Sequence, residues 1–417
     1  MAGSPGRPGD GRLRSCQSGS DDRRGPRHPR PPVRQGLNLV PASDKTIGEA
    51  LDQLFATRGA APAETAIILP AEPYLDAAGE ALRRRIFLTR GEGGENLCLR
   101  PDFTIPVCMR HIAEGADLPR RYSYRGLVFR QRADGPAEFV QAGIEDLGED
   151  NRAMADARAV ADALASLETC GIALDGLDVI LGDQGLFEAV LRALGLPEGW
   201  QRRLIRTFGH DGQLRAALES LSKGPESALE GLAPELLDLA RDREEGALTR
   251  LIRGRMEEAG LPPHSGRSPG EIAARLIEKV AVAEARLGEG PLQLLENFLA
   301  VACPLDEAGE RLAEVMGTAG LDLGRAMTAF ETRNLALRAA NVDLARVTYR
   351  AAFGRPIDYY TGLVFEARDK GAEDPLVGGG RYDRLMTILG AGTPIPAVGF
   401  SLWIDRIEKV SDCGISA

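Results

Sequence analysis

Eight polar or aromatic residues in three stretches of the chain have the chemistry to bind a small zwitterion. They are two acids, a threonine, a glutamine, two arginines and two tyrosines, namely Asp102, Thr104, Arg130, Gln141, Glu145, Arg355, Tyr359 and Tyr360. An ammonium group needs carboxylate or carbonyl acceptors, and a carboxylate needs cations or N–H donors. A small concave site with a few placed polar groups would meet both needs. The set therefore suits a free amino acid.

Each of these residues, taken alone, also has an ordinary structural explanation. Asp102 could be a helix N-cap, and Tyr359 and Tyr360 are common strand residues. Glu145 could be a solvated strand residue. The glycine run at 378–380 shows only that the backbone turns there or that another group approaches it closely. The joint order and spacing of these segments therefore carry the argument.

The stretch from 121 to 147 predicts two antiparallel strands that position two of the candidates. Residues 121–129 and 138–147 have strand character, and the loop between them holds Asp134-Gly135-Pro136. Alternate residues of a strand point to opposite faces. Gln141 and Glu145 are therefore expected on one face of the second strand.

The rest of the pattern predicts an α+β protein, in which an antiparallel sheet is crossed by helices and interrupted by a helical insertion. Residues 104–112 predict a helix with Pro106 in its first turn, where a missing N–H does little harm. Further helices are expected at 47–58, 151–170, 381–389 and 402–411, and throughout most of 187–341 apart from a loop at 262–270. Further strands are expected at 67–70, 96–100, 178–181, 346–352, 359–367, 376–378 and 397–400.

Composition excludes several classes of protein. The chain has 417 residues, 43% of them hydrophobic, and no run approaches the ~18 apolar residues that cross a membrane. The net charge of −10 argues mildly against a general nucleic-acid binder. None of the six cysteines forms a Cys-x-x-Cys pair, and only four histidines exist, so zinc-site spacing is absent. We therefore expect reduced thiols, no metal and a cytoplasmic location.

Residues 1–36 are expected to form a disordered basic extension. The first 35 residues hold eight arginines and three aspartates but almost no apolar residue, so they cannot offset the entropy of ordering. A nucleic-acid-binding arm is one interpretation. A solvated extension, or a start codon assigned too far upstream, is another.

Five segments in this order resemble the catalytic core of histidyl-tRNA synthetase, a class II aminoacyl-tRNA synthetase. They are Leu99-Arg100-Pro101-Asp102-Phe103-Thr104, Tyr124-Arg125-Gly126-Leu127-Val128-Phe129-Arg130, Phe139-Val140-Gln141-Ala142-Gly143-Ile144-Glu145, Asp358-Tyr359-Tyr360-Thr361-Gly362 and Gly378-Gly379-Gly380-Arg381-Tyr382-Asp383. The resemblance covers roughly residues 37–409, with the helical insertion poorly covered. It implies the class II fold with its six-stranded antiparallel sheet. The synthetase-like core would comprise residues 37–185 and 342–417, with a mainly helical insertion and return helices at 186–341.

The resemblance assigns a role in histidine binding to each candidate. It implies that Asp102, Thr104 and Gln141 hold the α-amino group, and that Glu145 meets the imidazole. Tyr360, with Tyr359 beside it, is expected on the other side of the ring. Arg355 would face the carboxylate, and Arg130 matches an arginine that faces the activated phosphate in the synthetase.

Four departures from the synthetase pattern affect the ATP-binding residues. The run Arg130-Gln131-Arg132-Ala133 lacks the glutamate that reads adenine, and the loop after it is shorter than usual. Trp403 stands where the motif 3 helix begins with a glycine that leaves room for the nucleotide. Pro356 replaces a glycine, and only eleven residues follow Arg406, the match to the motif 3 arginine. The pattern therefore predicts that histidine binding is kept, while ATP activation and tRNA recognition are lost.

These features resemble the regulatory subunit of ATP phosphoribosyltransferase, a synthetase paralogue. The stretches at 69–75 and 99–107 look like that family. It implies a non-catalytic chain without a cofactor that assembles with a short-form catalytic subunit, takes L-histidine as feedback effector and dimerises through the class II core. No membrane and no tRNA are expected as partners.

Two other interpretations remain open. Arg130, Arg355 and Arg406 could still stabilise a phosphate-centred transition state, which would make the chain a divergent or truncated synthetase that activates histidine with ATP. A scaffold on an unused synthetase fold would show no histidine affinity.

Overall fold

The computed structural model describes residues 42–77, 80–132, 135–223, 229, 231–259, 268–285, 287–355 and 359–415. Several sequence predictions lie outside these residues. They concern the extension at 1–36, most of the loop at 262–270, the middle of the loop after Arg130, and Pro356.

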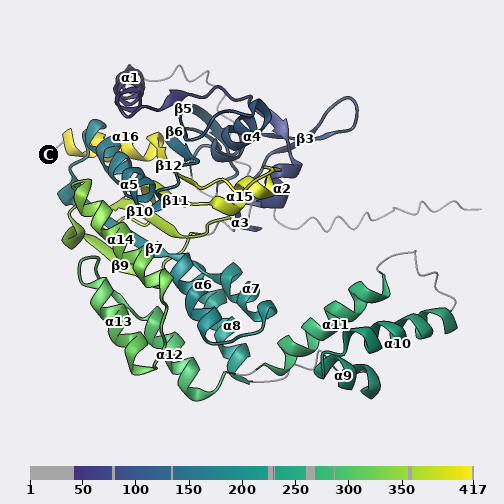
Figure 1. Ribbon diagram of the computed structural model, residues 1–417. Helices are drawn as coiled ribbons and strands as arrows, with labels where there is room; N and C mark the ends of the chain where they lie inside the picture. The colour runs from purple at the N-terminus through teal and green to yellow at the C-terminus, as the bar shows by residue number, and fades with distance from the viewer. Residues whose placement is uncertain are drawn as a thin grey trace, which may run out of the picture. The chain divides into compact units, whose positions relative to one another are not determined.

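Among the described residues, a nine-stranded sheet forms the centre of the fold (Figure 1). Its strands in spatial order are β1 (Ala61–Pro62), β5 (Arg120–Phe129), β6 (Glu138–Leu147), β12 (Ala397–Trp403), β11 (Pro375–Arg381), β10 (Leu363–Asp369), β7 (Leu177–Asp183), β9 (Val347–Arg350) and β8 (Ala302–Pro304). The six strands from β5 to β7 are all antiparallel to their neighbours, whereas β1 and β9 pair in parallel. This antiparallel core confirms the predicted α+β, class II synthetase-like fold.

Helices and a small second sheet surround the central sheet. The second sheet has the order β2 (Ile68–Pro70), β4 (Asn96–Leu99) and β3 (Leu88–Arg90). The helices before the insertion are α1 (Ala42–Thr57), α2 (Glu72–Ala77), α3 (Glu80–Arg83), α4 (Thr104–Glu114) and α5 (Arg152–Thr169). Those after it are α15 (Asp383–Ile388) and α16 (Ile404–Ile415).

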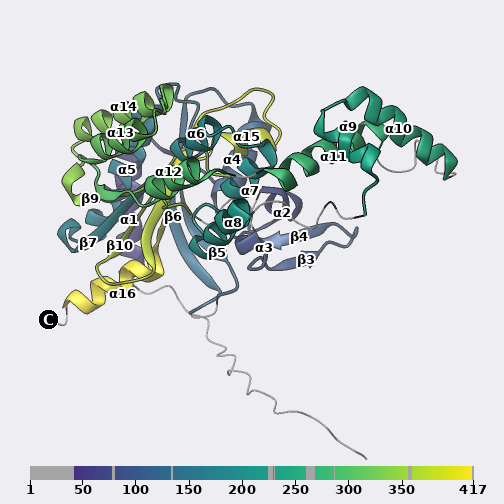
Figure 2. The ribbon, with the colours of Figure 1, turned by 90° about the horizontal axis from the view of Figure 1, so that it is seen from below.

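The stretch between β7 and β9 is mainly helical, as predicted. Its helices are α6 (Gln184–Ala193), α7 (Glu198–Thr207), α8 (Asp211–Lys223), α9 (Pro234–Arg241), α10 (Glu245–Glu258), α11 (Pro269–Glu284), α12 (Glu289–Leu299), α13 (Ala308–Thr318) and α14 (Arg325–Ala339). Helices α9, α10 and α11 pack on one another (Figure 2) and bury a small apolar cluster of their own that includes Leu248 and Ile252. The other six helices contribute to the main core. The domain division at residues 186 and 341 remains a prediction.

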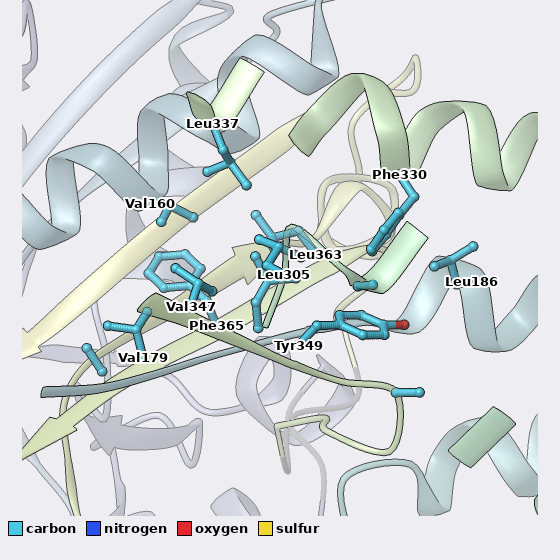
Figure 3. Close-up of a cluster of buried hydrophobic side chains, with 14 of the residues drawn as sticks. Val160, Val179, Leu186, Leu305, Phe330, Leu337, Val347, Tyr349, Leu363 and Phe365 are labelled. Carbon is cyan, nitrogen blue, oxygen red and sulfur yellow. The ribbon is translucent and has the colours of Figure 1, made fainter. Parts of the chain in front are cut away.

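Two apolar cores cover the two faces of the sheet. Leu363 and Phe365 of β10 lie in one core with Phe330 of α14 (Figure 3), whereas Val364 between them lies in the other. The same alternation puts Ile144 of β6 into the first core. This period of two leaves the odd-numbered residues of β6 on the other face, where the candidate site is.

Helix α5 packs on the face of the sheet that carries the first core. The side chain of Asn151 caps its first turn by accepting from the N–H of Met154 at 3.1 Å. Its small residues Ala155 and Ala159 pack on Val398 of β12, so the helix lies close to the strands. Helix α14 packs on α5 in turn.

Some predicted boundaries were wrong by several residues. Strand β12 continues to Trp403, so this residue ends a strand rather than opening the last helix. Strand β10 begins at Leu363 rather than at 359, and β11 runs on to Arg381. The elements β1, β3, β8, α2 and α3 were missed, because strands of two or three residues and single helical turns carry too little periodicity to detect.

Candidate functional site

All eight candidate residues line one cavity on the sheet. The same cavity is lined by Gly378, Gly379, Tyr382, Gly399, Phe400, Ser401 and Trp403. Asp102 and Thr104 lie at the start of α4, Gln141 and Glu145 lie on β6, and the remaining candidates flank β5, β9 and β10. The cavity has a volume of about 30 Å³. The structure therefore brings the candidates together, while their role in histidine binding remains a prediction.

Glu145 lies at the centre of the site, with 1% of its surface exposed. The hydroxyl of Thr104 donates to its Oε1 at 2.7 Å, and the hydroxyl of Tyr382 donates to its Oε2. A Cβ at Gly399 would lie 1.8 Å from Oε2, so only glycine fits beneath the carboxylate. Burial raises the pKa of Glu145 to about 8, although the two hydroxyl groups act in the opposite direction.

Two neighbouring side chains have buried polar atoms that no described residue satisfies. Asp102 lies one residue before Phe103, the N-cap of α4, and is not itself the cap. Its Oδ1 accepts from the N–H of Ile105 at 3.4 Å, but its Oδ2 has no partner. Neither the Oε1 nor the Nε2 atom of Gln141 has one. Burial raises the pKa of Asp102, and the guanidinium of Arg130 acts against this rise. Since buried polar groups are nearly always paired, these atoms mark a place where a ligand could bind.

The candidate arginines, by contrast, have protein partners. Arg355 donates from Nε to Glu366 at 2.9 Å and from Nη1 to the hydroxyl of Tyr360 at 2.8 Å. Its guanidinium lies on Gly378, where a Cβ would come within 2.8 Å of Cζ. Arg130 donates from Nε to the carbonyl of Pro101 at 2.6 Å and so braces the residue before Asp102.

Trp403 lines the cavity at the end of β12, with 6% of its surface exposed. The guanidinium carbons of Arg406 and Arg355 lie 4.9 Å and 5.6 Å from its ring centroid. Arg406 also pairs with Asp374 at 3.0 Å and donates to the carbonyl of Pro375 at 2.8 Å. The place where the resemblance expects a nucleotide thus holds an indole and arginines that already have partners.

Sequence reasoning missed Tyr382, although it lies in one of the five segments. Its contact with Glu145 joins the end of β11 to β6, and no local sequence pattern predicts a contact between segments so far apart. The same holds for Tyr124, whose hydroxyl contacts Ser401 Oγ at 2.7 Å and donates to the carbonyl of Phe400 at 3.0 Å.

The described residues contain neither a membrane-spanning helix nor a cluster of metal ligands. None of the described helices is both long enough and apolar enough to span a membrane. Within the same residues, no group of three or more histidine, cysteine or acidic side chains could hold a metal ion. Cys98, Cys108, Cys170 and Cys303 are free thiols, and the first three are buried.

Comparison with known proteins places this chain in a family. The family model "Histidyl-tRNA synthetase" matches residues 42–253 and 273–407. The ATP phosphoribosyltransferase regulatory subunit of Allorhizobium ampelinum is 55% identical over 363 residues, which are 87% of this chain and 96% of that protein. The chain belongs to the family of ATP phosphoribosyltransferase regulatory subunits. The subunit of Mesorhizobium japonicum is 53% identical over 368 residues, which are 88% of this chain and 97% of its own length.

Solved structures agree on the fold of this regulatory subunit family. A protein from Bacillus halodurans described as an ATP phosphoribosyltransferase regulatory subunit/histidyl-tRNA synthetase matches with a TM-score of 0.62 at 21% identity, over 88% of this chain and 78% of that one. Histidyl-tRNA synthetase from Nostoc matches with a TM-score of 0.58 at 17% identity, over 88% and 72%. The family is thus one of regulatory subunits built on a synthetase fold, as the sequence motifs predicted.

Proposed function

We propose that this chain binds L-histidine in the cavity around Glu145 and that it regulates a short-form ATP phosphoribosyltransferase catalytic subunit. Bound histidine would lower the rate of the first step of histidine biosynthesis. The single observation that supports the ligand is the buried acidic cavity, in which Asp102 Oδ2 and the amide of Gln141 have no protein partner. Family membership supports the partner.

The chemistry of the cavity suits histidine group by group. The α-ammonium can donate to Asp102 Oδ2 and to Gln141 Oε1, and so it would supply the donors that these buried acceptors lack. The imidazole can form a hydrogen bond with the carboxyl group of Glu145, which Thr104 and Tyr382 already hold in place. The carboxylate of histidine would take an arginine, and Arg355 and Arg130 both line the cavity.

The cavity must enlarge for histidine to enter. A volume of about 30 Å³ is enough for only about two water molecules. The bond from Arg355 to the hydroxyl of Tyr360 joins two residues that line the cavity, and it is the natural one to break because the carboxylate of histidine can replace it. A ligand that binds only the open state shifts the protein toward that state, typically by ~1–3 kcal/mol in allosteric proteins. The catalytic subunit can sense this change.

The test is phosphoribosyl-ATP formation by a purified short-form catalytic subunit, with and without this chain, across a histidine titration. We expect the chain to raise the rate and histidine to suppress it. Glu145→Ala should remove the suppression but keep complex formation. Glu138→Ala, an exposed residue of the same strand, is the matched control and should behave like the wild type. Normal inhibition of the Glu145→Ala complex would overturn the placement of the effector.

The alternative of a histidine-activating enzyme makes a different prediction. A divergent synthetase would catalyse histidine-dependent exchange between ATP and pyrophosphate. We expect no exchange, because Arg355 and Arg406 are already held by Glu366 and Asp374. ATP–pyrophosphate exchange above background would favour the interpretation as a divergent synthetase.

Two further expectations belong to the same proposal. The class II core is expected to form a dimer, as the resemblance implies, which sedimentation would test. The complex is expected to act in the cytoplasm, a setting that suits the four free thiols of the described residues.

A further inference from the structure

A second cavity, of about 450 Å³, lies where α5, α6 and α14 begin. It is distinct from the cavity around Glu145, because the two share no lining residue. We propose that this second cavity binds the phosphoryl group of a small metabolite.

Three helix N-termini converge on it. Ala153 of α5, Gly185 of α6 and Ala326 of α14 line the cavity, and each lies in the first turn of its helix. These helices have 18, 10 and 15 residues, long enough to carry a full macrodipole. The N-terminus of a helix attracts anions through its dipole and its free N–H groups. Asn151 and Asp183 each accept from one of these N–H groups, in α5 and in α6.

Charged side chains add to the positive electrostatic potential of these helix N-termini. Five arginines line the cavity against two aspartates. Arg152, Arg192 and Arg325 are exposed and form its rim, while Arg333 and Arg381 are buried in its floor. The excess is positive although the chain as a whole has a net charge of −10, so the cavity differs from the average surface.

The decisive observation is the state of Arg333, which is 4% exposed. Its Nη1 donates to Asp183 at 2.5 Å, but Nε and Nη2 are buried with no partner among the described residues. Nε and Nη2 form one edge of the guanidinium, the edge that makes two parallel hydrogen bonds with a phosphate or carboxylate. Leaving this edge unsatisfied is costly unless an anion completes it.

Arg381 is a useful contrast in the same floor. It donates to Asp156 at 2.8 Å, to Asp383 at 2.9 Å and to the carbonyl of Arg152 at 3.2 Å, so all three of its nitrogens are used. Arg381 is therefore structural, whereas Arg333 has two of its three nitrogens without a partner among the described residues. At the rim, Arg152 pairs with Asp383 at 3.3 Å and Arg192 pairs with Glu188 at 3.6 Å, so the excess of positive charge is smaller than the five arginines alone would give. Three helix N-termini beside an unsatisfied guanidinium edge are a typical setting for a phosphate.

The test is titration calorimetry of the full chain with inorganic phosphate at low ionic strength. We expect saturable binding that weakens about tenfold or more in Arg333→Met, which loses two charge-assisted hydrogen bonds. Arg325→Gln removes only an exposed charge at the rim and should weaken binding several-fold without affecting folding. It keeps the test decisive if Arg333→Met fails to fold. Arg338→Gln, an exposed residue further along α14, is the matched control.

Three outcomes would overturn the proposal. They are the absence of saturable phosphate binding to the wild type, an affinity unchanged in Arg325→Gln, and acetate binding as tight as that of phosphate. Glu145→Gln should leave phosphate binding intact, which separates this site from the proposed histidine cavity.

Discussion

The cavity around Glu145 has two halves that differ in how their polar groups are satisfied. In one half, Asp102 and Gln141 keep buried atoms without a partner. In the other half, Arg355 is paired with Glu366, and Arg406, which packs on Trp403 outside the cavity, is paired with Asp374. A buried polar atom without a partner costs about 1–3 kcal/mol, so a fold does not keep several of them in one place without a reason. The comparison teaches that the first half leaves hydrogen-bonding groups unsatisfied, whereas in the second the protein supplies partners for its arginines.

Glycines support both halves of the cavity, but to different ends. Gly399 lets the carboxylate of Glu145 approach the floor, and Gly378 lets the guanidinium of Arg355 do the same. The first approach presents an acid to the cavity. The second places a cation where Glu366 and Tyr360 can neutralise it or bond to it.

The largest expected effect concerns the pH dependence of stability through Glu145. Its folded pKa of about 8 lies above the ordinary value of 4.5, so the folded protein binds the proton more tightly than the unfolded chain. The stability that comes from this proton is complete below pH 4.5 and is lost as the pH rises towards 8, by up to about 5 kcal/mol. Glu145→Gln cannot ionise and should lack this loss. Urea unfolding at several pH values between 5 and 8.5 measures it.

Equal pH slopes for the wild type and Glu145→Gln would contradict the comparison, because Glu145 would then not be a desolvated acid. Glu138→Gln on the same strand controls for general charge effects, since its side chain is exposed.

The next effect tests whether Trp403 fills its half of the cavity. Trp403→Gly should lower the free energy of unfolding by about 3–5 kcal/mol, as large-to-small changes of buried aromatic residues do. It should not create ATP–pyrophosphate exchange, because the arginines keep their partners. Chemical denaturation measures the first result, with Trp403→Phe as the milder control. A loss below about 1 kcal/mol would show that the indole packs loosely there.

The sequence predicted the half of the cavity that holds Asp102 and Gln141 better than the other half, for a physical reason. Thr104, Gln141 and Glu145 lie in regular elements whose periodicity fixes the side on which each residue points, and Asp102 lies just before α4. Strand β6 was predicted with its observed bounds, so the alternation from Gln141 to Glu145 followed directly.

The other half depends on contacts between distant segments. Nothing local predicts that Arg406 meets Asp374, or that the hydroxyl of Tyr382 reaches Glu145. Trp403 was identified as a departure from the family pattern but was assigned to a helix, because an apolar strand end that runs directly into an amphipathic helix has no boundary signal. The three-stranded second sheet was likewise predicted only in part, since β3 has three exposed residues and no alternation.

A smaller effect should come from Gln141, where stability and binding are expected to move in opposite directions. Gln141→Leu removes two buried polar atoms without partners and should raise the free energy of unfolding by about 1 kcal/mol. The same change should weaken histidine binding about tenfold, since one acceptor of the ammonium is lost. Thermal unfolding and calorimetry measure the two results.

The matched control for this variant is Gln201→Leu. The amide of Gln201 donates to the carbonyl of Leu196 at 2.7 Å, so its loss should destabilise the protein. If Gln141→Leu also destabilised the protein, its amide would have partners in solution, and the contrast between the two halves would weaken.

The smallest expected effect is that of Arg406, which packs on Trp403 without lining the cavity. Its partner Asp374 has 77% of its side chain exposed, and such surface pairs contribute only about 0–1 kcal/mol. Arg406→Met keeps an apolar stem over Trp403, so stability should change by about 1 kcal/mol or less. Histidine affinity should change by less than about twofold, because Arg406 does not line the cavity. Arg130→Met provides the contrast, since Arg130 braces the carbonyl before Asp102 and its loss should weaken binding clearly. Similar losses of histidine affinity in both variants would mean that the two halves act as one site.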